Sequence, residues 1–202
     1  AYFFYGLTRF SVDLDFDLKP STDTSQVRQK LNRIFQDLEL KVVNENVKSL
    51  FFETKYPSVK NSRNTLKLSI FEDLVTANDY QPHFLPEINR TLTCQTIDTM
   101  FANKLIAITD RYNKHQHIAG RDIYDIHYFF SQGFHFKPEI IQQRTNTDVK
   151  TYLKTLADFI ENKLTETIID QDLNTLLSNE KFQKVRKTLK TEVLLFLRNN
   201  KI

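Results

Sequence analysis

The sequence predicts an α+β fold, with strands and helices mixed in its first half and helices in its second half. Between residues 10 and 71, short segments alternate apolar and polar residues with a period of two, which is typical of strands. From residue 96 onward, apolar residues recur at helical spacing, and glycine and proline stand at expected helix ends. The change lies near residue 93, which predicts an α/β core over residues 1–93 and a helical domain over residues 94–202.

The first half is expected to hold several strands and one helix. Residues 10–18 alternate cleanly and predict a strand, and residues 26–37 predict a helix with Ser25 as its N-cap. Residues 40–43 are expected to form a further strand or to join the end of this helix. Strands are also predicted over residues 50–56 and 65–71, with a polar turn or hairpin connection over residues 57–64. Residues 79–89 carry two prolines and predict a loop with a short strand. The expected core-facing side chains of the first strand and the helix are Phe10, Val12, Leu14, Phe16, Val27, Leu31, Ile34, Phe35 and Leu38.

The second half is expected to be a series of helices. Residues 96–112 and 121–131 each carry a helical apolar stripe, and Gly133 is placed to end the second helix. Pro138 is placed to begin a further short helix. Helical segments over residues 148–163, 173–177 and 180–200 complete the prediction.

Composition limits the classes of function that this chain can have. No segment approaches the roughly 20 apolar residues of a membrane span, so we expect no membrane partner. The single Cys94, which its apolar neighbours suggest is buried, excludes an internal disulfide and fits a reducing, cytoplasmic location. The net charge of +3 gives no overall signal for nucleic acid. Five basic residues near the C-terminus could bind RNA or form a solvated helix face: Lys181, Lys184, Arg186, Lys187 and Lys190.

Asp13 and Asp15 form a D-x-D pair on the first predicted strand. Side chains alternate along a strand, so both carboxylates point to one face and repel each other. A divalent cation such as Mg²⁺ or Mn²⁺ removes that repulsion, and hard oxygen ligands of this kind hold the metal in phosphate chemistry. The strand therefore predicts a metal platform, with an acidic, solvated sheet face as the alternative.

A second group of charged residues lies on the two predicted helices that begin near residues 96 and 121. Lys104 and Arg111 are two turns apart on nearly the same helix face, and Asp122 and Asp125 share a face at i and i+3. Lysine and arginine are natural partners for triphosphate oxygens. The alternatives are a lysine that extends along the surface to water and an ion-pair network, including Arg121, that braces two helices.

Together these two groups resemble the AbiEii/AbiGii-type nucleotidyltransferase toxins. Residues 5–16, YGLTRFSVDLDF, resemble the first motif of that family, and residues 104–125 match its later pattern K-x-x-A-x-x-x-R followed by R-D-x-x-D. The resemblance implies a DNA polymerase β-like nucleotidyltransferase core with a mixed sheet, followed by a helical C-terminal half. It also implies a toxin of a type IV toxin–antitoxin or abortive-infection system, with an antitoxin as partner.

The resemblance assigns a role to each motif residue. Asp13 and Asp15 would hold Mg²⁺ (or Mn²⁺), and Asp125 would be an active-site acid supported by Asp122. Lys104 would be catalytic through contact with phosphate. The nucleotide-binding residues would be Arg9, Ser11, Lys104, Arg111 and Arg121.

Two features depart from the family pattern. The Gly-Gly pair that usually precedes the first motif is absent before Ala1, so we expect a processed or truncated beginning with part of the core missing. The strand expected to carry a third carboxylate presents Lys67 and Ser69 instead, and Glu53 and Glu72 are the candidates to replace it.

The predicted activity is metal-dependent transfer of a nucleoside monophosphate from an NTP to a hydroxyl group of RNA or protein. One alternative is a degenerate nucleotidyltransferase that binds nucleotide or a partner without catalysis. Another is a structural or interaction protein whose paired acids are solvated.

Overall fold

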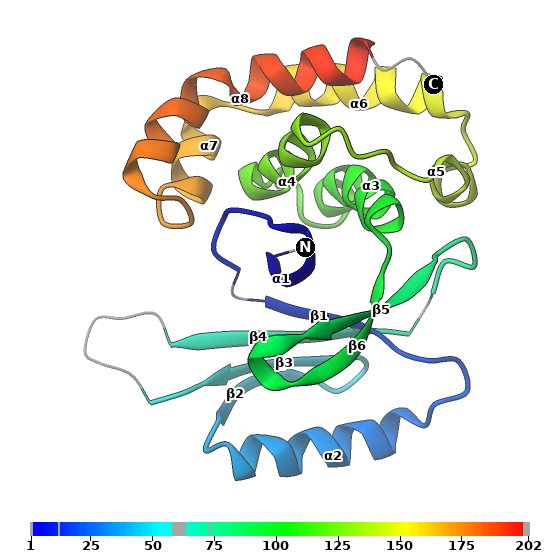
Figure 1. The fold of residues 1–202 in the computed structure, drawn as a ribbon, viewed down its shortest axis with the longest axis vertical. Coiled ribbons are helices and arrows are strands. Elements are labelled where there is room, and N and C mark those ends of the chain that lie inside the picture. The colour runs from blue at the N-terminus through cyan, green and yellow to red at the C-terminus, as the bar shows by residue number, and fades with distance from the viewer. Residues whose placement is uncertain (1, 12, 58–63, 73, 200–202) are drawn as a thin grey trace. The chain divides into compact units, whose positions relative to one another are not determined.

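The computed structural model describes residues 2–11, 13–57, 64–72 and 74–199. It confirms the α+β class: a four-stranded mixed sheet comes early in the chain, and the C-terminal half is helical (Figure 1). The chain divides into two compact units, one of residues 11–74 and the other of residues 1–10 and 75–202. The predicted domains, 1–93 and 94–202, have different limits and stay a prediction.

The unit of residues 11–74 is built on a sheet with the strand order β1-β4-β3-β2. Its strands are β1 (Asp13–Asp17), β2 (Lys41–Asn46), β3 (Leu50–Lys55) and β4 (Thr65–Phe71). β1 pairs in parallel with β4, whereas β3 is antiparallel to both β4 and β2. A parallel pair requires a long crossover, which here includes helix α2 (Thr24–Asp37) and the β2–β3 hairpin. Most of the predicted connection over residues 57–64 lies outside the described residues.

Helix α2 packs on one face of this sheet and forms its core. Phe35 of α2 lies against Leu50, Phe52 and Leu68, and the Phe35 and Phe52 rings meet edge to face at 5.2 Å. The N-cap is Asp23, so the prediction of Ser25 was wrong. Asp23 has an extended backbone, and its carboxylate accepts from the Ser25 amide, which places Ser25 inside the first helical turn.

The expected apolar face of β1 is only partly buried. Phe16 is 49% exposed, and Phe10, which precedes the strand, is 57% exposed. The physical reason is that β1 is an edge strand, while the core of α2 lies over β3 and β4. Ile34 and Leu38 of α2 were also expected to face the core and are exposed. Val12 lies outside the described residues.

The second unit is mainly helical. Five of the predicted helical segments are confirmed, with ends that differ by at most a few residues, and they correspond to α3, α4, α5, α6 and α8. The sequence did not predict α7, and its predicted helix over residues 173–177 was wrong. The Thr165 hydroxyl caps α7 by accepting a hydrogen bond from the Ile168 amide, so this helix begins at Glu166 and ends where the predicted helix was to begin. The helices are α1 (Tyr2–Tyr5), α3 (Ile97–His115), α4 (Gly120–Ser131), α5 (Pro138–Thr145), α6 (Val149–Lys163), α7 (Glu166–Leu173) and α8 (Asn179–Asn199).

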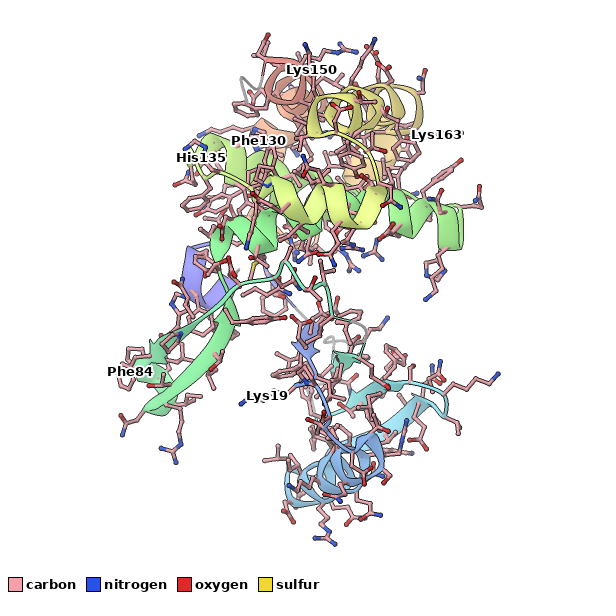
Figure 2. All side chains as sticks on the ribbon, turned by 90° about the vertical axis from the view of Figure 1, so that its right-hand side faces the viewer. Lys19, Phe84, Phe130, His135, Lys150 and Lys163 are labelled. Carbon is pink, nitrogen blue, oxygen red and sulfur yellow. The ribbon has the colours of Figure 1, made fainter. Side chains whose placement is uncertain are left out.

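A two-stranded hairpin precedes α3 where the sequence predicted mainly loop. Strands β5 (Tyr80–Leu85) and β6 (Arg90–Gln95) are joined by the 3₁₀ turn η1 (Pro86–Ile88). Pro82 is accommodated because the sheet has two strands, so a residue without an N–H can lie on an edge. Phe84 lies exposed on this hairpin (Figure 2). Cys94 of β6 is half-buried rather than buried, and burial raises the pKa of its thiol.

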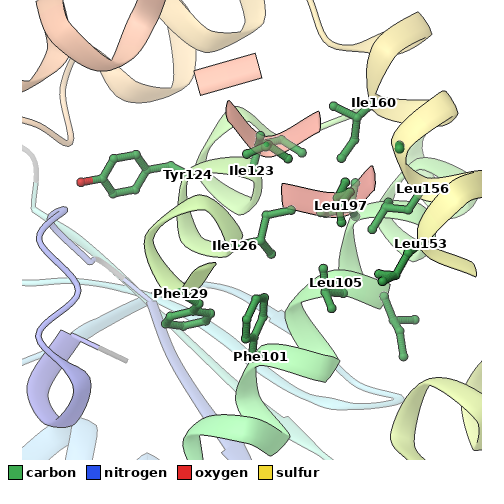
Figure 3. Packing of buried hydrophobic residues seen from close by; sticks show 14 of the residues in the cluster. Phe101, Leu105, Ile123, Tyr124, Ile126, Phe129, Leu153, Leu156, Ile160 and Leu197 are labelled. Carbon is green, nitrogen blue, oxygen red and sulfur yellow. The ribbon is translucent and has the colours of Figure 1, made fainter. Parts of the chain in front are cut away.

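The core of the helical unit gathers apolar side chains from α3, α4, α6 and α8. Phe101 and Leu105 meet Ile126 and Phe129, and residues of α6 and α8 close the cluster (Figure 3). Gly133 follows the end of α4 with φ +70°, the left-handed conformation that glycine adopts without strain, which confirms its predicted role. Among the described residues, no helix combines the length and apolar character needed to cross a membrane.

Candidate active site

Lys104 of α3 lies beside two acids of α4. Its ammonium nitrogen is 3.0 Å from Asp125 Oδ2 and 3.6 Å from Asp122 Oδ1. The helical spacing explains the arrangement, because positions 122 and 125 share the face of α4 that packs against α3. The Lys104 side chain keeps 29% exposure, whereas the Asp125 side chain has none.

Arg9 approaches Asp125 from a distant part of the sequence, 116 residues away. Its Nε donates to Asp125 Oδ1 at 2.5 Å and its Nη2 donates to Oδ2 at 2.8 Å, which is a two-pronged fork. The third nitrogen, Nη1, donates to the carbonyl of Phe10 at 3.1 Å. Arg9 is only 8% exposed, so this is a buried ion pair.

Arg111 extends the cluster along α3. Its Nε donates to Asp122 Oδ2 at 2.8 Å, and its side chain remains 33% exposed. The charges therefore alternate in the order Arg9, Asp125, Lys104, Asp122 and Arg111. Three cations against two carboxylates leave the group with one net positive charge, and its exposed members are cations. Asp125, which the alternative prediction placed in a bracing network with Arg121, is paired here with Arg9 and Lys104.

The pKa values of the partly exposed Lys104 and the buried Asp125 shift toward the charged forms. Burial alone would lower the pKa of Lys104, but the carboxylates of Asp125 and Asp122 outweigh it and raise that pKa above its ordinary value. Burial alone would raise the pKa of Asp125, but Lys104 and Arg9 hold that pKa below its ordinary value. Lys104 and Asp125 are consequently both ionised at neutral pH.

The segment that leads into the first strand is fixed to the helical unit by two further hydrogen bonds. The Thr8 hydroxyl lies 2.7 Å from the Tyr124 hydroxyl, and the Phe10 amide donates to the Leu176 carbonyl at 2.9 Å. Figure 3 shows the Tyr124 hydroxyl directed away from the apolar cluster. Sequence reasoning did not select Thr8 or Tyr124, although both lie inside the two quoted motifs.

Asp13 and Asp15 lie on β1, in the other unit, on the sheet face opposite α2. The strand register places Lys67 beside Asp13 and Ser69 beside Asp15 on the same face, because paired residues of adjacent strands point the same way. Glu53 is paired with Lys67 on the next strand, so Lys67 stands between Glu53 and Asp13 in one row. Ser11 lies two positions before the first residue of β1 in the sequence.

Glu72, the other candidate for a third carboxylate, follows β4. It lines a pocket together with Thr24, Ser25 and Arg28 of α2. Within the described ranges, no three His, Cys, Asp or Glu side chains converge in a way that could hold a metal ion. Asp13 and Asp15 could supply carboxylate oxygens of the kind that Mg²⁺ prefers, and a metal at this pair stays a prediction.

The structure brings together five of the predicted site residues, namely Arg9, Lys104, Arg111, Asp122 and Asp125. Arg121 is half-buried in the first turn of α4. Asp13, Asp15 and Ser11 belong to the unit of residues 11–74. The role that each of these residues has in catalysis stays a prediction.

The family model described as "Nucleotidyl transferase AbiEii toxin, Type IV TA system" matches residues 2–195. The chain belongs to this family. The match confirms the resemblance drawn from the two motifs and extends it through most of α8. No curated protein matches the chain, and no solved structure matches it.

In this AbiEii-family chain, most of the basic residues of α8 are engaged within the helical unit. Lys190 donates to two carbonyls at the end of α6, at 2.8 and 2.7 Å. Arg186 pairs with Asp170, and Lys184 pairs with Glu180 one turn away. Of the five basic residues, Lys181 and Lys187 are exposed and have no ion pair or hydrogen bond of their side chains among the bonds described. The bonds of the other three favour a solvated helix face that braces the unit over an RNA-binding face.

Proposed function

We propose that this chain is an active, metal-dependent nucleotidyltransferase. It moves a nucleoside monophosphate from an NTP to a hydroxyl group of an RNA or protein acceptor, as a toxin whose cognate antitoxin is its partner. The family match over residues 2–195 carries this proposal, because it covers both motifs and the helices between and after them. The cluster of alternating charges around Lys104 supports the proposal, because its partly exposed cations could bind a triphosphate.

Lys104 is suited to bind the triphosphate. Its ammonium group is held by Asp125 and Asp122 but stays partly exposed, so it can meet an anion without a large rearrangement. Arg111, also partly exposed and fixed by Asp122, adds a second positive charge on the same helix. The net positive charge of the cluster favours an anionic ligand over a cationic one.

Asp13 and Asp15 are suited to hold the metal. They project from one face of an edge strand and supply two of the oxygen ligands that Mg²⁺ takes, which leaves other positions for nucleotide and water. Only three residues separate Arg9 from Asp13 in the sequence, so the first motif contains both this arginine and the two acids.

In the proposed step, the acceptor oxygen forms a bond to the α-phosphorus as the bond from that phosphorus to the pyrophosphate oxygen breaks. Asp15 takes the proton of the acceptor hydroxyl as general base. Lys104 stabilises the negative charge that develops on the departing pyrophosphate. Mg²⁺, when bound, supplies charge neutralisation and lowers the pKa of the acceptor.

The test is label transfer from each α-³²P-labelled NTP to total cellular RNA and protein, with and without Mg²⁺. Asp13→Asn, Asp15→Asn and Lys104→Met are each expected to lower transfer at least a hundredfold, the size of effect seen when a charge-stabilising group is removed. Thr155→Val on the exposed side of α6 serves as the control and is expected to retain full transfer.

Each outcome separates the candidate functions. Retained turnover in Asp13→Asn or Asp15→Asn would remove the proposed metal site. Nucleotide binding with no transfer by the unaltered chain would support the degenerate, binding-only alternative. Absence of both would support a structural or interaction protein.

A further inference from the structure

We infer that Arg9 is a positioning residue, which holds Asp125 and thereby Lys104 for catalysis, and that it does not bind the nucleotide phosphates. The inference deepens the proposed function and rests on it. It replaces the phosphate-binding role that the first motif suggests for Arg9.

The Arg9 guanidinium is already engaged by protein groups. Nε and Nη2 grip the two oxygens of Asp125, and Nη1 donates to the Phe10 carbonyl. Arg9 is 8% exposed and Asp125 is fully buried. A phosphate could reach this guanidinium only by displacing a buried carboxylate, which would leave that carboxylate without its strongest partner.

Arg9 and Lys104 share the negative charge of Asp125. Asp125 Oδ2 accepts from both Arg9 and Lys104, while Oδ1 accepts from Arg9. Without Arg9, Lys104 and Arg111 would face two carboxylates and the cluster would lose its net positive charge. The Lys104 ammonium would then be drawn inward to neutralise Asp125. Arg9 thus leaves Lys104 free to stabilise the negative charge that develops on the departing pyrophosphate, an interaction that is strongest in the transition state.

Arg9 lies between two other residues that are hydrogen-bonded to the helices of the same unit. Thr8 meets the Tyr124 hydroxyl and the Phe10 amide meets the Leu176 carbonyl, so three consecutive residues are tied to the helical unit. Of the three residues, Arg9 makes the charged, buried interaction, and its two parallel hydrogen bonds to Asp125 restrict the geometry more than the single bonds of Thr8 and Phe10 do.

The experiment compares Arg9→Met and Arg9→Lys with the control Arg90→Met, which removes an exposed arginine of the hairpin. The readouts are kcat, KM and the dissociation constant for Mg²⁺–NTP. For Arg9→Met, we expect kcat to fall about ten- to a hundredfold while the dissociation constant changes less than about threefold, because the lost interaction is not made with the substrate. Arg9→Lys should not restore kcat, since an ammonium lacks the two-pronged fork.

A double-mutant cycle measures the clamp itself. Arg9→Met and Asp125→Asn, alone and together, should show a coupling of about tenfold or more in the unfolding equilibrium constant, as expected for directly bonded charges. If Arg9→Met fails to fold, Arg9→Lys, which keeps a cation beside Asp125, still reports kcat and nucleotide affinity.

The opposite results would overturn the inference. A dissociation constant raised more than about tenfold in Arg9→Met with kcat unchanged, and recovery in Arg9→Lys, would make Arg9 a phosphate ligand. Unchanged kcat and affinity in folded Arg9→Met would reduce Arg9 to a structural role. If the unaltered chain neither binds nor transfers nucleotide, the proposed function fails and this inference fails with it.

Discussion

At the residue scale, the stability of the charge cluster depends on each of its members keeping a partner. Asp125 is fully buried, and a buried carboxylate is tolerated because Arg9 and Lys104 replace the water it has lost. Removing one partner of such a pair is more damaging than never having formed it. The cluster should therefore respond strongly to changes in protonation.

Stability should fall in acid through Asp125. Its pKa is lower in the folded than in the unfolded chain, so its contribution is fully present above about pH 4 and is lost as the pH falls through the folded-state pKa. Urea unfolding at several values between pH 3 and pH 7 should show a steeper acid loss for the unaltered chain than for Asp125→Asn. The exposed Asp158, 3.9 Å from Arg198, provides a control: Asp158→Asn should keep the steep loss. Parallel pH profiles for the unaltered chain and Asp125→Asn would contradict the prediction.

At the element scale, helix α4 is held where its first turn meets α7. The Gly120 amide donates to Asp172 Oδ2 at 2.6 Å, and a Cβ at Gly120 would lie 3.2 Å from the Ile168 carbonyl oxygen. The absence of a side chain at Gly120 thus sets the approach of α7 to the helix that carries Asp122 and Asp125.

Gly120→Ala should destabilise the chain by about 1–3 kcal/mol, because the added methyl group has no room against the α7 backbone. The measurement is the midpoint and slope of urea unfolding. Gly133→Asn is the matched control. Its position has φ +70° and no atom within 4 Å of the added Cβ, and asparagine tolerates that conformation, so little change is expected. Equal losses in the two variants would show that packing at α7 is not the cause.

Sequence pattern predicted those elements whose signals are local. The alternation in β1, the stripes of α3 and α4 and the glycine after α4 needed only neighbouring residues. The hairpin β5–β6 was missed because Pro82 breaks the strand signal and its pairing is visible only in three dimensions. α7 was missed because its start depends on the Thr165 cap, not on a long stripe.

In the candidate site too, the sequence predicted the local relationships but not the long-range ones. Helical spacing placed Lys104 with Arg111 and Asp122 with Asp125 on shared faces, and the structure brings them together. The Arg9–Asp125 fork joins residues 116 positions apart, and no periodicity in the sequence connects them. The burial of Asp125 likewise follows from tertiary packing, so sequence alone could not separate a phosphate ligand from a positioning group.

At the scale of the whole molecule, the two units have unequal cores. In the sheet unit, Phe35, Leu50, Phe52 and Leu68 are the buried hydrophobic residues of its cluster in the described part of the chain. The helical unit buries a much larger cluster drawn from α3, α4, α6, α7 and α8. A unit of residues 11–74 is small, and small units bury a smaller fraction of their surface, so its free energy of opening should be lower.

Hydrogen–deuterium exchange should therefore show the sheet unit opening first. We expect amides of the central strands β3 and β4 to exchange at least about tenfold faster than those of α3 and α6, because the exchange rate follows the free energy of local opening. Peptides from α6 and β3 compared in one sample control for intrinsic rates, once corrected for sequence. Leu50→Ala should accelerate β3 and β4 further while leaving α6 unchanged, since the cavity lies in the core of the sheet unit. Equal protection of β3 and α6, or acceleration of both by Leu50→Ala, would show that the chain opens as one cooperative body.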